Sequence, residues 1–120
     1  DITSQVEDIV AGSGVRSGLC LIQVLHTTAG LTINENADPD VRVDIIEQLT
    51  RIVPFSKDYH HNEGNSDAHV KASLVGFSES LFVDDSSLVL GTWQGVYLCE
   101  FDGPRRRYVV IKVVSDEIRG

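Results

Sequence analysis

The sequence is poor in positive charge. Its 10 lysines and arginines stand against 18 aspartates and glutamates, which gives a formal net charge of −8 at pH 7. Binding to nucleic acid needs clustered positive charge that displaces counterions, so we expect no nucleic-acid partner. The one basic cluster, three consecutive arginines at 105–107, suits a small anion rather than a duplex.

Cysteines and long apolar runs are also scarce. Cys20 and Cys99 could form one disulfide, but each lies in an apolar stretch, and this setting favours buried free thiols in a reducing compartment. No run of 18 apolar residues occurs, and the first residues lack the basic-then-apolar order of a signal peptide. We therefore expect a cytoplasmic protein with no membrane partner.

One domain, residues 1–120, with one hydrophobic core suits the length and the hydrophobic fraction of 42%. The charged fraction of 23% is that of a folded chain rather than a disordered one. Two helices and about six or seven strands are expected. Together they predict an α+β domain whose mostly antiparallel sheet is covered by helices.

Apolar residues at helical spacing predict two helices. The first covers residues 2–10 and stops at the glycines that follow. The second begins after Asp38, whose carboxylate can cap a helix with Pro39 at its first position, and Pro54 ends it. Residues 68–75 form either a short helix or an extended segment, and we favour the helix.

Strands are predicted at six apolar stretches. These are residues 19–25, 31–33, 81–83, 88–90, 96–101 and 107–114. The third and fourth flank a polar turn at 84–87 and are expected to pair as a hairpin. The last two, joined by Asp102-Gly103-Pro104, make the clearest hairpin in the sequence.

Three of the four histidines lie in one polar segment, residues 59–76. His61 and His69 are eight positions apart, and a loop containing glycine can bring them together, while His26 would add a third imidazole from a strand end. Imidazole is the commonest metal ligand and titrates nearest neutral pH. Three of them with an open position predict a catalytic metal site. The spacing matches no standard zinc motif, and exposed loop histidines without a role are the alternative.

Acids flank these histidines. Asp67 and Glu63 can bind a metal directly, or accept hydrogen bonds that fix the imidazole tautomers. We expect Asp67 to belong to the catalytic set. His60 points away from its neighbour His61 and is interpreted as a surface residue.

Hydroxyl and amide groups at Thr27, Thr28 and Asn34 lie between a strand end and a helix N-terminus. Such a place suits an anion or sugar-like hydroxyls, so these three residues are candidate substrate ligands. Turn and capping chemistry is an equal alternative, which already explains Asp38 and also fits Asn36.

Trp93 and Gln94, between two glycines, can form a pocket wall where the ring stacks and the amide reads a polar edge. The alternative is that Trp93 is simply the largest core residue.

Glu100 lies on the apolar face of its strand, where an unpaired acid is costly. It can meet an arginine of the 105–107 cluster, a histidine or a neighbouring subunit, or it can face outward at an edge. Arg105 and Arg107, after a Gly-Pro turn, can fork onto a phosphate. The alternative is that these arginines only keep the tip of a hairpin soluble.

With these residues, the chain resembles the YjbQ family, described as secondary thiamine-phosphate synthases. The matching segments span nearly the whole chain in order. They are HTTAGLTINENADPD at 26–40, HNEGNSDAH at 61–69, LGTWQG at 90–95 and EFDGPR at 100–105.

The resemblance implies an α+β homotrimer with a polar pocket near the subunit interfaces. It also implies a weak thiamine-phosphate synthase activity, which need not be the main role. The residues it points to are His26, His61 and His69 as the metal-binding or catalytic set, with Asp67, Asn34, Trp93 and Gln94 nearby.

Three functions follow. A transferase, assisted by a divalent metal such as Zn or Mg, would join a pyrimidine-methyl pyrophosphate to a thiazole phosphate, and the departing pyrophosphate would need a cation or arginines. The chain lacks aspartate-rich Mg²⁺ sites, and histidines favour zinc-like metals. The alternatives are a non-catalytic trimer that binds a metal or metabolite, and a metal-free hydrolase with histidines as acid and base.

Overall fold

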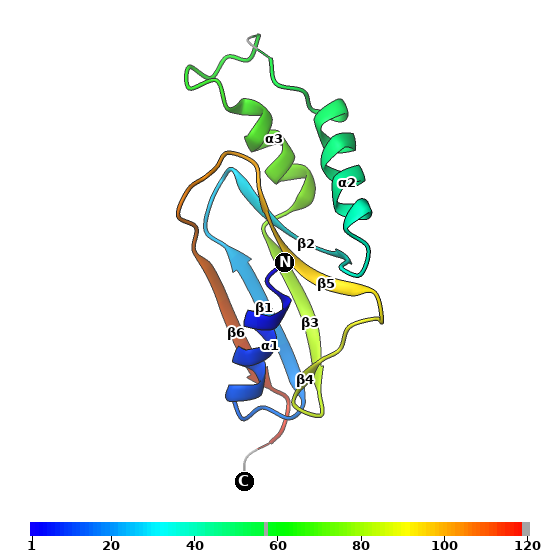
Figure 1. Ribbon diagram of the computed structural model, residues 1–120. Helices are drawn as coiled ribbons and strands as arrows, with labels where there is room; N and C mark the ends of the chain where they lie inside the picture. The colour runs from blue at the N-terminus through cyan, green and yellow to red at the C-terminus, as the bar shows by residue number, and fades with distance from the viewer. Residues whose placement is uncertain (57, 119–120) are drawn as a thin grey trace.

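The computed structural model describes residues 1–56 and 58–118 (Figure 1). The elements in chain order are α1 (Thr3–Gly12), β1 (Gly18–Val24), β2 (Ala29–Glu35), α2 (Pro39–Ile52), α3 (Ser66–Val75), β3 (Ser78–Asp84), β4 (Ser87–Leu88), β5 (Gln94–Glu100) and β6 (Val109–Ser115). The described strands form a four-stranded sheet ordered β4-β3-β1-β6 and a two-stranded ribbon, β2-β5. Every pair among them is antiparallel, so the predicted α+β class is confirmed.

Local sequence signals set the helix ends. The Asp38 carboxylate accepts a hydrogen bond from the Asp40 amide at 2.9 Å, which caps α2 one residue before Pro39. α2 ends at Ile52, ahead of Pro54. The favoured helix near residues 68–75 is confirmed as α3, and Gly76 with φ 98° follows it.

The β3–β4 hairpin is confirmed, with Val83 paired to Leu88. Its turn residues Asp85 and Ser86 have φ angles of 51° and 61°. Two consecutive positive φ angles are the mark of the turn type whose twist matches a hairpin.

The hairpin predicted between residues 96–101 and 107–114 is wrong. β5 pairs with β2, and β6 pairs with β1. The connection after β5 is anchored at both ends to the single loop between β1 and β2, because the Phe101 amide donates to the Thr28 carbonyl and the Leu25 amide donates to the Tyr108 carbonyl. Apolar alternation identifies a strand but does not identify its partner.

This pairing makes a corner between the two sheets. Residues 25–28 connect β1 to β2, and residues 101–108 connect β5 to β6 beside them. The first connection has four residues and the second has eight. Because they lie side by side, the longer one bulges outward. Figure 1 shows both connections rising toward α3. The corner therefore brings polar residues of the two loops together.

The core lies between α1, one face of the four-stranded sheet and the β2-β5 ribbon. Its largest fully buried side chains are Val6, Val10, Cys20, Ile22, Leu31 and Val96. The opposite face of the sheet exposes Leu19, Leu21 and Phe82, the last at 70%. Within residues 1–56 and 58–118, helices therefore cover only one face of the sheet.

Two further expectations concern cysteines and membranes. Both cysteines are free, with Cys20 buried and Cys99 half-buried. In the described part of the chain, no helix has the length and apolar character needed to cross a membrane.

Candidate functional site

An open polar hollow of about 710 Å³ lies at the corner between the sheets. The two connecting loops and the His-rich segment line it together. Its polar lining residues are His26, Thr27, Thr28, His61, Glu63, Asn65, His69, Asp102, Arg105, Arg106 and Arg107. The expectation that His26 meets the segment containing His61 and His69 is therefore met within one chain.

His26 is fixed by the loop opposite. Its Nε2 atom accepts a hydrogen bond from the Tyr108 amide at 2.7 Å, and the two rings stack with centroids 6.1 Å apart. An imidazole that accepts through Nε2 carries its proton on Nδ1 when it is neutral. His26 thus holds the corner together and presents an N–H group at its other nitrogen.

His61 and His69 form an edge-to-face pair. Their ring centroids are 5.4 Å apart and their planes lie at 87°. The Nε2 atom of His61 is 3.9 Å from the Glu63 carboxylate, and the His61 side chain is 42% exposed. Two adjacent imidazoles open to the hollow can exchange protons with a bound molecule.

The three histidines surround the hollow but do not converge on one point. Across residues 1–56 and 58–118, no group of three or more His, Cys, Asp or Glu side chains has an arrangement that could hold a metal ion. His26 also has its Nε2 atom engaged by Tyr108. The arrangement in one chain therefore does not fit a three-histidine metal site, and the assignment of His26, His61 and His69 as ligands stays a prediction.

Arg107 and Glu100 form a two-pronged ion pair. Arg107 Nε donates to Glu100 Oε2 at 2.5 Å, and Nη2 donates to Oε1 at 2.7 Å. Nη2 also donates to the Thr28 hydroxyl at 2.9 Å. The Arg107 side chain is only 7% exposed, and the bonds to Glu100 raise its pKa. The expected pairing of Glu100 with the arginine cluster is present, and it makes Arg107 a fixed wall of the hollow.

Asn65, Asp102 and Arg105 form a second polar cluster. Asn65 Nδ2 donates to Asp102 Oδ2 at 2.8 Å, and Arg105 Nη2 lies 3.0 Å from the same oxygen. The hydrogen bond from Asn65 comes first among the causes that lower the pKa of Asp102, followed by the charge of Arg105. Asn65 Oδ1 is buried and lacks a hydrogen-bond partner among the described residues. A buried acceptor without a donor commonly awaits a water, ion or ligand.

Arg106 is exposed and makes no ion pair or side-chain hydrogen bond with any described residue. Arg105 is 53% exposed, and Thr27 is exposed beside them. These groups are open to an anion. The three consecutive arginines pointed to this loop, but their spacing does not distinguish Arg106 from Arg107. No sequence pattern indicated the contact between Asn65 and Asp102.

Two expected ligands, Trp93 and Gln94, lie elsewhere. In the ribbon Ala29 faces Glu100 beside the hollow, whereas Glu35 faces Gln94 at the far end. Six residues of strand separate these ends by about 20 Å. Trp93 is 62% exposed at that far end, so the core alternative is wrong, and Gln94 Oε1 accepts from the Gly91 amide.

Asn34 and Asp67 also lie outside the polar hollow. Asn34 lines a separate hollow under α2. The Asp67 carboxylate lies 3.3 Å from Lys71 Nζ, and both side chains are largely buried, at 14% and 11% exposure. His60 is exposed and does not line the hollow, as expected of a surface residue.

Comparison with known proteins gives a consistent result. The family described as "UPF0047 protein YjbQ-like" matches residues 1–116. A UPF0047 protein of Methanocaldococcus jannaschii is 50% identical over 98% of this chain and 85% of its own length. The UPF0047 protein YugU of Bacillus subtilis is 50% identical over 96% of this chain and 88% of its own length.

Solved structures agree with this fold. A YjbQ/UPF0047 family protein of Clostridium acetobutylicum has a TM-score of 0.91 and 52% identity, covering 95% of this chain and 88% of that one. A protein of Sulfolobus solfataricus, described as YbjQ-like and of unknown function, has a TM-score of 0.92 and 37% identity, covering 97% and 86%. The resemblance carried by the four sequence segments is thus confirmed over almost the whole chain, and the chain belongs to the YjbQ-like UPF0047 family.

Proposed function

We propose that this protein is a small-molecule enzyme that acts on a phosphorylated substrate in the polar hollow. The proposed reaction joins a pyrimidine-methyl pyrophosphate to a thiazole phosphate and releases pyrophosphate. One observation carries the proposal: three arginines and three histidines share the lining of one open hollow. Anion-binding and proton-moving groups therefore reach the same bound molecule.

The arginines meet the main electrostatic demand of this reaction. When the carbon–oxygen bond to pyrophosphate breaks, negative charge builds up on the departing group. Arg105 and Arg106 can fork onto its oxygens, because the guanidinium plane matches phosphate geometry. Arg107 acts by positioning, since its bonds to Glu100 and Thr28 hold the loop that carries the other two.

The histidines and Asn65 complete the chemistry. His61 and His69 can give a proton to the departing oxygen or take one from the substrate. Asn65 Oδ1, buried without a donor in the described structure, can accept from an amino or hydroxyl group of the bound molecule. The role expected for Asp67 would be indirect, because its carboxylate faces Lys71.

The decisive experiment measures thiamine phosphate formation from the two substrates. We expect His69→Ala and Arg106→Gln to lower kcat/KM by about 10²-fold or more, which is typical of lost acid–base or charge-stabilising groups. His60→Ala is the matched control, since His60 lies outside the hollow. Equal rates of thiamine phosphate formation by wild type and His69→Ala would contradict the proposal.

A metal-free hydrolase is the second candidate, favoured by the edge-to-face pair of His61 and His69 at 5.4 Å. Two imidazoles can serve as acid and base in hydrolysis of a phosphate ester. A bell-shaped pH–rate profile for ester hydrolysis, unchanged by chelator, would favour this reaction over the transferase. Binding of the phosphorylated compounds without turnover would instead indicate a metabolite-binding protein.

We also propose that the protein forms a homotrimer. The exposed face of the four-stranded sheet supports self-association, because Leu19 lies between Phe82 and Val114 and all three are exposed. The number of subunits rests on the family resemblance. Sedimentation equilibrium should give three chains for wild type and for Ala11→Glu on α1, but fewer for Phe82→Glu. A monomeric wild type would contradict this.

A further inference from the structure

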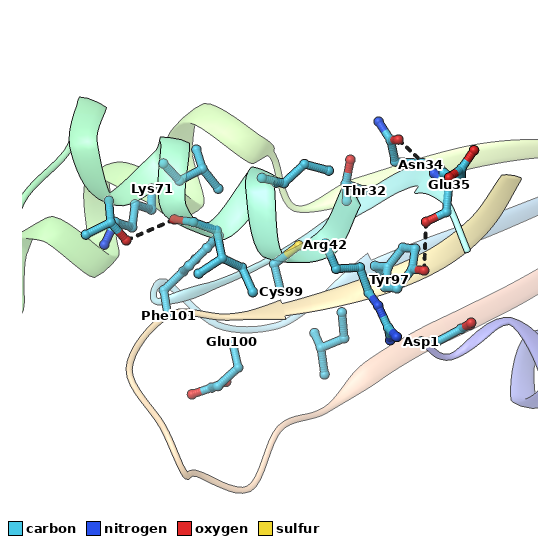
Figure 2. Close-up of a pocket in the computed structure, with 15 residues that line it drawn as sticks. Asp1, Thr32, Asn34, Glu35, Arg42, Lys71, Tyr97, Cys99, Glu100 and Phe101 are labelled. Carbon is cyan, nitrogen blue, oxygen red and sulfur yellow. Dashed lines mark hydrogen bonds between the residues drawn. The ribbon is translucent and has the colours of Figure 1, made fainter. Parts of the chain in front are cut away.

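A second hollow of about 440 Å³ lies between α2 and the outer face of the β2-β5 ribbon. In Figure 2 the helix lies along one side, while Tyr97 and Cys99 lie along the ribbon below it. Glu100 points away from the helix, because it lies on the opposite face of β5 and reaches Arg107. The two hollows are therefore chemically separate, and the proposed reaction uses only the polar one.

The walls of this second hollow are mostly apolar and incompletely packed. Ile45 and Leu49 on α2 line it together with Phe101 at the end of β5, yet all three side chains stay partly exposed. α2 has no buried residue at all. Protein interiors normally fill such spaces to crystal-like density, so an unfilled apolar gap loses contacts that a suitable molecule would restore.

Charges around the hollow largely compensate one another. Asp1 and Glu35 lie at the same end as Arg42, whose guanidinium carbon sits 6.0 Å from the centre of the Tyr97 ring. Lys71 is neutralised by its carboxylate partner, Asp67. Two carboxylates thus stand against one guanidinium, so these lining residues offer no spare positive charge to an anion, and an uncharged occupant avoids the cost of desolvating an unpaired ion.

A short polar edge runs along β2. Thr32 and Asn34 are two positions apart on one strand and therefore face the same side. Within the described structure, neither the Thr32 hydroxyl nor Asn34 Nδ2 takes part in a hydrogen bond, whereas Asn34 Oδ1 accepts from the Glu35 amide. One edge of an otherwise apolar hollow can therefore form hydrogen bonds with a hydroxyl or carbonyl group of a bound molecule.

We propose that the hollow under α2 is a binding site for an uncharged aromatic small molecule with one polar edge. The rings lie between Leu49 and the Tyr97–Cys99 floor, and the polar edge meets Thr32 and Asn34. The volume fits, since pockets for small molecules typically measure about 300–1,000 Å³ and combine apolar walls with a few polar groups. The site shares no lining residue with the polar hollow.

The chain's two cysteines provide the test. Cys99 lines the hollow, whereas Cys20 is fully buried in the core and serves as an internal control. Burial raises the pKa of the Cys99 thiol, so its alkylation by iodoacetamide is slow enough to follow by mass spectrometry. The probe is 2-naphthol, a neutral two-ring compound with one hydroxyl.

We expect 2-naphthol to slow Cys99 alkylation saturably, about tenfold when its concentration is about ten times its Kd. Leu49→Glu should abolish this protection, while Val43→Glu, on the same helix but outside the hollow, should keep it. Thr32→Val, which keeps the shape, should weaken binding about threefold to tenfold. Arg106→Gln should leave protection unchanged, which separates this site from the proposed function.

Two results would overturn the proposal. The first is no protection of Cys99 up to the solubility of 2-naphthol in a wild-type protein whose Cys99 reacts. The second is a Cys99 that is already protected without probe and becomes reactive on dilution, because a second copy of the chain would then fill the hollow.

Discussion

Asn65 Nδ2 lies 2.8 Å from Asp102 Oδ2, and this hydrogen bond joins two segments that are 37 positions apart in the sequence. Asn65 immediately precedes α3, next to the pair of His61 and His69. Asp102 begins the loop that carries the arginines. The bond therefore sets the distance between the histidine side and the arginine side of the polar hollow.

Removal of this bond should shift the titration of Asp102. The bond lowers the pKa of Asp102 below its ordinary value of 3.8, so Asn65→Ala should raise it toward that value, with Arg105 still holding it somewhat low. The ionised carboxylate stabilises the fold above 3.8, and this contribution is lost as the pH falls through the lower folded pKa. Carbon-13 NMR of the Asp102 carboxyl measures the shift. An identical pKa in both proteins would contradict the account.

The second prediction concerns Arg107. Arg107→Lys should lower the free energy of unfolding by about 1–3 kcal/mol, because lysine cannot fork onto Glu100 and also reach Thr28. Urea unfolding measures this loss. Arg106→Lys is the matched control and should change it by less than about 0.5 kcal/mol, since Arg106 is exposed. Equal effects of the two substitutions would refute the positioning role of Arg107.

The third prediction concerns the tautomer of His26. Because Nε2 accepts from the Tyr108 amide, neutral His26 should carry its proton on Nδ1. Long-range proton–nitrogen NMR correlations of the neutral ring distinguish the two tautomers. His60, which is exposed, serves as the reference. A proton found on Nε2 of His26 would show that the corner is held in another way.

The sequence predicted those features that depend on neighbouring residues. Asp38 and Pro39 start a helix through local capping, and the β3–β4 turn depends on residues that tolerate positive φ. The partner of β5 is fixed by contacts distant in sequence, and apolar alternation is the same for any partner. The predicted hairpin failed for that reason.

The candidate site was predicted in the same uneven way. His26, His61 and His69 do line one hollow, because the strand end and the loop lie close together, as the sequence predicted. Trp93 and Gln94 do not line this hollow. A sequence motif groups residues, but it does not show at which end of a ribbon they lie. The bonds of Arg107 to Thr28 link residues too distant in sequence for spacing to reveal.

We propose that the polar hollow binds a phosphorylated group through its arginines. Titration calorimetry with inorganic pyrophosphate, in the presence of a chelator, tests it most directly. We expect saturable binding at one site per chain. Arg106→Gln should weaken it about tenfold or more, and Lys112→Gln on β6, which is exposed outside the hollow, should leave it unchanged. No binding by wild type, or equal binding by wild type and Arg106→Gln, would contradict it.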